Sequence, residues 1–307
     1  PEVFTCALLN AQPMGFYSPA QLIADAQRSG VEVRPVDINY SAWDSTLELV
    51  PQARHALRLG LRLVKGLNAV EAARITACRS EGYQSVEDII TRSDISAKTI
   101  ELIAAADGLR SLGLNARQGF WQARKQGRLQ MNKLPLFAQA DNRNKIIKQD
   151  DDSYLKLPPS LFGEQIAQDY TATGLSLKGH PVDSLKAWFE KDRWQGCSAI
   201  DEAPNGRRLR LIGLVTMRQR PGTAKGTVFV TIEDSLLSVN VIVWPHIVER
   251  DRTALLGAHL MGVYGRLQRQ GSVTHFIAES VHNCDSYLGF LHASDQQAPR
   301  LKSRDFH

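Results

Sequence analysis

The sequence predicts a multi-domain α+β protein whose helical regions come first and whose last folded domain is a small β-barrel. Its 307 residues are too many for one compact unit. Residues 51–128 carry short helical patterns separated by glycine turns, which is typical of a helix-hairpin-helix region. Residues 207–283 carry five runs of alternating apolar residues with a helix between the third and fourth, as in a five-stranded OB-fold β-barrel.

The first fifty residues mix short helical patterns with turns. Ser18 and Pro19 mark a helix start, because serine caps free amides and proline fits the first helical turn. The apolar stripe of this helix consists of Leu22, Ile23 and Ala26. We expect residues 1–50 to be the end of a larger domain, which makes the chain a piece of a longer protein.

The helical region 51–128 opens on a period-two pattern. This pattern predicts a short strand over residues 56–64 with Arg58 and Arg62 on its polar side. Helical spacing follows over residues 69–79, where Val70, Ala73 and Ala77 share a face. Further helices are expected over 85–92, after the capping residue Ser96, and in a basic stretch through Trp121.

Three segments flank or connect these domains. Residues 129–159 are predicted to be a linker, because they hold three consecutive aspartates, a proline pair and one apolar island. Residues 160–206 carry two helical patterns and are expected to form a helical connector. Residues 284–307 are polar and basic, which predicts a flexible C-terminal tail.

The predicted barrel carries the residue types of a nucleic-acid site. Its strands are expected over 209–217, 227–234, 238–244, 259–267 and 273–281. Cations lie in or beside the two loops that border the binding face of OB folds, and rings for base stacking lie on the strands. The cations are Arg218, Arg220, Lys225, Arg266 and Arg269, and the rings are Phe229, Tyr264 and Phe276. An alternative stays open, because strand aromatics more often belong to the core and loop arginines are often only solvated.

Composition favours a binding protein without its own active site. The net charge of +5 mildly favours polyanionic partners. The sequence has no run of about eighteen apolar residues, so it predicts no membrane span. The four cysteines form no C-x-x-C pair, which fits a reducing cytoplasm. The sequence shows no catalytic carboxylate pair, activated nucleophile or metal-binding cluster.

Three features in a fixed order resemble one protein family. A helical module runs from Leu57 to Leu67 and on through Asp107-Gly108-Leu109, a turn from Gly174 to Pro181 contains Gly-His-Pro, and the barrel follows. This order is similar to the C-terminal part of bacterial C-family DNA polymerases, the replicative alpha-subunit class. The stretch from Phe4 to Tyr17 and the closing residues from Ser303 to His307 resemble the error-prone branch, so the resemblance covers essentially the whole chain.

The resemblance implies the C-terminal DNA- and partner-binding portion of an error-prone DNA polymerase, acting in damage-induced mutagenesis and translesion synthesis. Residues 1–50 would end the fingers domain, and the helix-hairpin-helix region would grip the duplex backbone. The family motif has glycine where this chain has Asn68, a residue type that tolerates left-handed geometry. Candidate contacts are Lys65, Gly66, Asn68, Arg74, Arg79, Arg110 and Arg117, although solvated helix faces explain the cations equally well.

The family is a class of DNA-directed nucleotidyltransferases whose palm-domain carboxylates bind two metals. The resemblance places those carboxylates upstream of this segment. We therefore expect the parent protein to be an enzyme and this segment alone to be non-catalytic. No cofactor is expected in the segment, and magnesium is expected in the absent palm domain.

A short apolar peptide in the linker stands where the family docks on its sliding clamp. It consists of Lys133, Leu134, Pro135, Leu136 and Phe137. Its final Leu-Phe pair is the type that enters a preformed apolar pocket, whereas Lys133 replaces the usual glutamine. The alternative is that these apolar residues pack on their own domain.

The resemblance implies DNA as the main partner, both as primer-template duplex and as single strand, in the cytoplasm and away from membranes. The sliding clamp and an accessory Y-family-like mutasome protein are further candidate partners. Two alternatives remain: a protein-interaction scaffold whose barrel docks the mutasome partner rather than DNA, and a tRNA-binding OB module.

Overall fold

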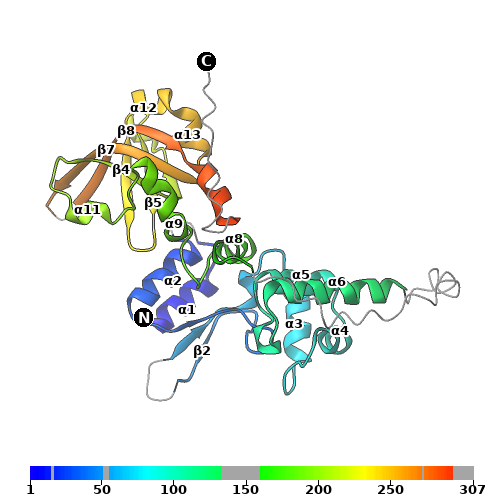
Figure 1. The fold of residues 1–307 in the computed structure, drawn as a ribbon. Helices are drawn as coiled ribbons and strands as arrows, with labels where there is room; N and C mark the ends of the chain where they lie inside the picture. The colour runs from blue at the N-terminus through cyan, green and yellow to red at the C-terminus, as the bar shows by residue number, and fades with distance from the viewer. Residues whose placement is uncertain (15–16, 51–54, 133–159, 272, 293–307) are drawn as a thin grey trace. The chain divides into compact units, whose positions relative to one another are not determined.

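The computed structural model describes residues 1–14, 17–50, 55–132, 160–271 and 273–292 (Figure 1). The chain divides into two compact units. The first unit comprises residues 1–160 and 168–177, and the second comprises residues 161–167 and 178–307. None of the described helices is long and apolar enough to cross a lipid bilayer.

The first unit begins with two helices and a small mixed sheet. Its elements are α1 (Glu2–Asn10), α2 (Pro19–Arg28), β1 (Val33–Arg34), β2 (Thr46–Glu48) and β3 (Ala56–Arg58). Strand β3 lies in the middle, parallel to β1 and antiparallel to β2. Ser18 caps α2 in a capping box with Gln21, as the sequence predicts. The boundary expected after residue 50 falls between the paired strands β2 and β3.

Short helical elements complete the first unit. They are η1 (Leu61–Leu63), α3 (Ala69–Ala77), α4 (Val86–Ser93), α5 (Ala97–Ala105), η2 (Arg110–Leu112), α6 (Ala116–Asn132) and the last part of α8 (Phe162–Thr173). Ile75, Ile89, Ile100 and Ile103 pack against sheet residues such as Leu57 in one apolar core. The expected helices after Ser85 and Ser96 are confirmed, and both serines accept a hydrogen bond from a first-turn amide.

The strand predicted over residues 56–64 is confirmed only for its first three residues. Arg58 is 8% exposed rather than on a solvated side, because Nε donates to Glu48 Oε1 at 2.7 Å. The chain then leaves the sheet at Gly60 and turns into η1. The period-two pattern arises because the residues that alternate with the arginines pack in the core on both sides of this turn.

The apolar face predicted for α3 is also corrected. Ala72 and Ile75 are its buried residues, whereas Val70 is 62% exposed and Ala73 and Ala77 are exposed as well. Small apolar residues at helical spacing do not distinguish a packed face from an open one, and the longer side chain of Ile75 decides which face is buried.

The second unit is built around a closed five-stranded barrel. The strands are β4 (Arg208–Gln219), β5 (Val228–Glu233), β6 (Ser238–Val243), β7 (Leu260–Gln270) and β8 (Val273–Asn283). They close in the order β4-β5-β6-β8-β7, with β6 and β8 parallel and every other neighbouring pair antiparallel. The prediction of a five-stranded OB-type barrel is confirmed, and two short helices, α12 and α13, stand where one helix was expected between the third and fourth strands.

Helices surround this barrel. Between β6 and β7 the chain forms α12 (Pro245–Arg250) and α13 (Arg252–Gly257), which lie at one end of the barrel (Figure 1). The remaining short elements are α9 (Pro181–Ser184), α10 (Lys186–Phe189), η5 (Glu190–Asp192), α11 (Ala199–Glu202), η6 (Gly222–Ala224) and η7 (Asp285–His292).

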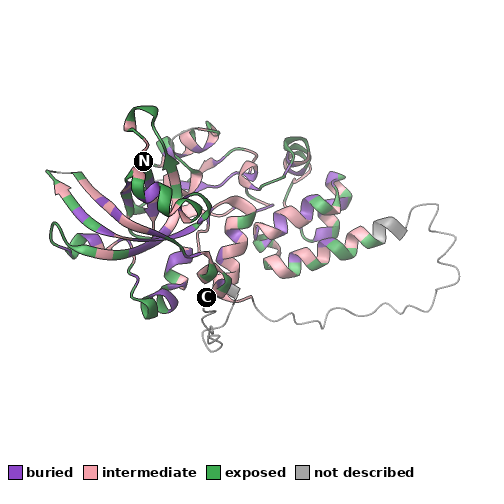
Figure 2. Cartoon of the chain, turned by 90° about the horizontal axis from the view of Figure 1, so that it is seen from above, coloured by how far each residue is buried: buried purple, intermediate pink, exposed green. Residues whose placement is uncertain are grey.

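The barrel strands alternate between an apolar interior and an outer face. Along β5 and β6, Val228, Val230, Val239, Val241 and Val243 are buried. The residues between them are exposed or half-buried, and this banding is visible along the strands in Figure 2. Because side chains alternate along a strand, these intervening residues point outward and form a surface that can meet a ligand.

Replacing Gly60 by alanine should destabilise the first unit. The added Cβ would lie 2.4 Å from the Asp44 carbonyl carbon and 2.5 Å from the Trp43 carbonyl oxygen, both backbone atoms. We expect the free energy of unfolding to fall by about 1–3 kcal/mol or more in urea titrations followed by circular dichroism. Gly222→Ala is the control, because its Cβ would meet nothing within 4 Å. Equal stability of the two variants would contradict the close approach.

Candidate nucleic-acid interface

The first hairpin turn joins η1 to α3 and presents backbone amides to solvent. Gly66 has a φ of +81°, in the left-handed region that favours glycine. Asn68 is extended, with a φ of −89°, and its side chain caps α3 by accepting from the Val70 amide at 2.8 Å. Asn68 therefore does not use the left-handed geometry that asparagine tolerates, and Gly66 takes the left-handed position in this turn.

This turn has the properties of an anion site. Lys65, Gly66 and Asn68 are exposed, and the amides of Gly66 and Asn68 have no acceptor among the described residues. They lie at the N-terminus of α3, where the helix dipole also favours negative charge. Lys65 Nζ donates to the Tyr170 carbonyl oxygen at 2.9 Å, which holds the lysine beside the turn.

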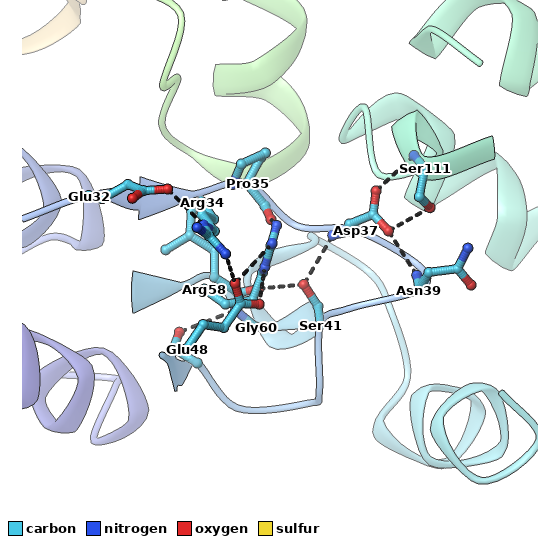
Figure 3. A network of polar contacts seen from close by, with 12 residues as sticks. Glu32, Arg34, Pro35, Asp37, Asn39, Ser41, Glu48, Arg58, Gly60 and Ser111 are labelled. Carbon is cyan, nitrogen blue, oxygen red and sulfur yellow. Dashed lines mark hydrogen bonds and ion pairs between the residues drawn. The ribbon is translucent and has the colours of Figure 1, made fainter. Parts of the chain in front are cut away.

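A buried polar network ties the segment from Asp37 to Ser41 to η2 and to the chain just before η1 (Figure 3). The Asp37 carboxylate accepts from the Asn39 amide at 2.8 Å and from the Ser111 amide and hydroxyl at 3.0 and 2.7 Å. Ser41 Oγ donates to the Leu59 carbonyl oxygen at 2.7 Å, just before η1. The chain segment from Asp37 to Ser41 therefore holds η2 and the residue that precedes Gly60 and η1 in one arrangement.

The other predicted cations of the helical region are mostly engaged with the protein itself. Arg74 donates to the Asp94 carbonyl oxygen at 3.1 Å, and Arg110 Nε donates to Asp107 at 2.8 Å. Arg79 is half-buried and donates to the Ser41 carbonyl oxygen, and its burial lowers its pKa. Arg117 is half-buried near the start of α6. The amides of Gly66 and Asn68, which have no acceptor among the described residues, are thus the donors best presented to a ligand.

One row of outward residues crosses the barrel from strand to strand. The register pairs Gln219 with Phe229, Phe229 with Ile242, Ile242 with Ile277, Ile277 with Arg266, and Arg266 with Arg208. We call these six residues the outer row. Paired residues on one face have Cβ atoms about 5 Å apart, so an apolar centre lies beside two guanidinium groups.

Trp244 extends this apolar centre, and sequence reasoning missed it. It follows β6 directly, is 46% exposed, and stands two residues after Ile242, which places it on the same face. Phe229 is 37% exposed and lies between the buried residues Val228 and Val230. The period of two around Ile242 was the available signal, because Trp244 continues it past the end of the strand.

The remaining residues predicted in the barrel divide into structural and surface groups. Phe276 is fully buried in the barrel core, so its ring has no surface to offer a base. Arg218 Nε donates to the Leu255 carbonyl oxygen at 2.7 Å, and burial lowers its pKa. Arg220 and Lys225 are exposed near the loop after β4, and Tyr264 is half-buried on β7.

Arg269 is likewise a structural residue. Its guanidinium donates to the carbonyl oxygens of Ala203, at 2.7 Å, and of Ile200, at the end of α11. Arg266, three residues earlier on the same strand, is exposed, and its guanidinium group has no hydrogen bond or ion pair with any described residue. The peptide from Lys133 to Phe137, predicted to bind a clamp, lies outside the described residues.

The contrast between these two arginines gives a matched test. Arg269→Met should lower the free energy of unfolding by about 1–3 kcal/mol, because the carbonyl oxygens of α11 lose a charged donor. Arg266→Met should change stability by less than about 0.5 kcal/mol but weaken binding of single-stranded DNA. Thermal unfolding and fluorescence anisotropy measure the two effects. The opposite pattern would show that the roles of the two arginines are exchanged.

Known proteins match both the helical region and the whole chain. A family model described as a helix-hairpin-helix motif matches residues 30–119. The chain is 42% identical over 299 residues to error-prone DNA polymerase 2 of Rhizobium meliloti, covering 96% of this chain and 27% of that protein. It is 40% identical to the error-prone DNA polymerase of Azoarcus sp., covering 100% of this chain and 28% of that protein.

A solved structure of asparaginyl-tRNA synthetase from Pyrococcus horikoshii aligns with 29% of this chain and 22% of its own, at 21% identity and a TM-score of 0.25. That similarity is too low to bear on function. The curated relatives are far longer than this chain, which spans about a quarter of their length. Over essentially its whole length, the chain is homologous to a segment of the error-prone DNA polymerases.

Proposed function

We propose that this chain is a DNA-binding portion of an error-prone DNA polymerase and that each of its two units contacts DNA. The observation that carries the proposal is the outer row of the barrel, with Phe229, Ile242 and Ile277 at its centre and two arginines at one end. The homology to error-prone DNA polymerases and the helix-hairpin-helix match support DNA as the ligand.

The hairpin turn of the first unit would hold the phosphate backbone of the duplex. The amides of Gly66 and Asn68 can donate to phosphate oxygens, and the Lys65 ammonium group adds charge without reading a base. Such contacts fix position and carry no sequence information. They therefore suit a polymerase that must accept any template.

The outer row of the barrel would hold single-stranded DNA. Bases stack on exposed rings such as Phe229 and Trp244, and cations such as Arg266 follow the backbone. Every base has a π face, so this surface would tolerate any sequence. Damaged templates would then be bound as readily as intact ones, which fits a role in translesion synthesis and damage-induced mutagenesis in the cytoplasm.

The stacking role is tested by substituting the two rings. Phe229→Ala and Trp244→Ala should each weaken binding of a fluorescent oligothymidine by about 1–3 kcal/mol, measured as anisotropy against protein concentration. Leu236→Ala is the control, because Leu236 is 67% exposed but lies in the turn between β5 and β6. Losses no larger than that of the control would exclude the two rings as a stacking surface.

Catalysis would belong to the rest of the parent polymerase, whose palm domain binds the metals. We expect purified residues 1–307 to incorporate no nucleotide into a primer-template with magnesium and all four triphosphates. Extension is followed on a denaturing gel, with a complete polymerase as the positive control. Robust extension by the segment would contradict the assignment.

The peptide from Lys133 to Phe137 remains a candidate clamp-binding site. Joint replacement of Leu136 and Phe137 by alanine should abolish capture of this chain by immobilised sliding clamp, because the pocket would lose both apolar side chains. Joint replacement of Leu155 and Leu157 is the control from the same linker. Unchanged capture after the first replacement would exclude the peptide.

A protein-docking barrel is the second candidate function, favoured by the apolar character of Ile242, Ile277 and Trp244. A mutasome partner would bury these residues rather than stack bases on them. Ionic strength separates the two functions. DNA affinity should fall steeply with salt, whereas apolar docking should not.

A further inference from the structure

A pocket lies in the barrel unit, where the end of β4 and the start of β5 meet α12 and α13. Its cavity volume is about 260 Å³. The apolar part of its lining is aliphatic: Val228 and Val248 are buried, and Leu256 on α13 is 57% exposed. Of the outer row, Gln219 alone also lines this pocket.

Three arginines complete the lining, and they are not equivalent. Arg218 is fixed to the end of α13 by its bonds to the carbonyl oxygens of Leu255 and Ala258. Arg220 and Arg252 are exposed, and their guanidinium groups make no hydrogen bond or ion pair with any described residue. The pocket therefore combines an aliphatic surface with two guanidinium groups whose donors are available to a ligand.

We propose that this pocket binds an acidic peptide segment of a partner protein. One apolar side chain would rest on Val228, Val248 and Leu256, and neighbouring carboxylates would pair with Arg220 and Arg252. Guanidinium groups match carboxylates in a bidentate geometry, and a pocket slightly below the usual range for drug-sized ligands suits a single side chain.

The positive charge of Arg220 and Arg252 would attract nucleic acid as well as an acidic peptide. The aliphatic lining of the pocket decides between these two ligands. Bases gain affinity by stacking on aromatic rings, and the described residues that line this pocket include none. The exposed rings Phe229 and Trp244 do not line it. The pocket shares Gln219 with the outer row but neither its rings nor its arginines, and the inference does not rest on the proposed DNA contacts.

The test uses residues 1–307 and a fluorescein-labelled hexapeptide of four aspartates followed by two leucines, titrated by anisotropy. Joint Arg220→Glu and Arg252→Glu substitution should weaken binding by about tenfold or more, since two charge pairs become repulsive. Leu256→Asp should weaken it by a similar factor. Arg266→Glu on the outer row is the matched control and should change the affinity less than about twofold.

Two altered peptides and one oligothymidine, each titrated separately, complete the design. Replacing the aspartates of the peptide by serine, or its leucines by glycine, should each remove most of the binding. Equal weakening by Arg266→Glu, or undiminished binding of the serine peptide, would overturn the proposal. So would an oligothymidine whose affinity falls as much as that of the peptide in the Arg220→Glu, Arg252→Glu variant, because the pocket would then be a nucleic-acid subsite.

Discussion

The carboxylate of Asp37 is the interaction on which the first unit depends. It is buried, and its two oxygens accept three hydrogen bonds from the backbone and side chain of nearby turns. The adjacent Ile38 amide donates to the Gly108 carbonyl oxygen at 2.8 Å. A single short segment thus bonds to Gly108 and to η2, within the region that matches a helix-hairpin-helix motif. Short helices depend on such tertiary hydrogen bonds and packing, because intrinsic helix propensity alone does not stabilise them.

A second ionic cluster supports the same segment from the sheet side. Glu48 accepts from Arg58 and Arg34, and the hydrogen bonds from these arginines lower the pKa of the Glu48 carboxyl group. Arg58 also donates to the Pro35 carbonyl oxygen at 2.9 Å (Figure 3). A nearly fully buried arginine is tolerated here because Nε, Nη1 and Nη2 of its guanidinium group each donate to an acceptor. In the barrel, closure of the strands plays the equivalent role by fixing which residues face outward.

The barrel could be predicted from the sequence because period-two runs, turn residues and the helix between the third and fourth runs all indicated one topology. The side-chain assignments were less successful for a physical reason. Phe229 and Phe276 both lie in β-branched surroundings, yet the first is 37% exposed and the second is fully buried. Their orientation depends on strand register, and β8 pairs with the distant strand β6, which no local pattern encodes.

Arginines were the hardest residues to assign. Arg218 and Arg269 occupy the loop-proximal positions expected of phosphate contacts, but their guanidinium groups bond to carbonyl oxygens at the ends of short helices. Arg266 has the same local sequence character and remains exposed. The position of a helix end relative to a strand depends on the tertiary fold, so local sequence patterns do not predict which arginine will bond to it. In the hairpin, the glycine at position 66 was recognisable, whereas the capping role of Asn68 depends on the extended backbone found there.

Backbone amides at the first hairpin turn are central to the account, and hydrogen exchange measures them directly. The amides of Gly66 and Asn68 have no acceptor among the described residues, so they should exchange rapidly in the free protein. Addition of a saturating primer-template duplex should slow exchange in a peptide spanning residues 64–71, while a peptide spanning 186–192 stays unchanged. Identical exchange of the hairpin peptide with and without bound duplex would contradict the claim that this turn holds the DNA backbone.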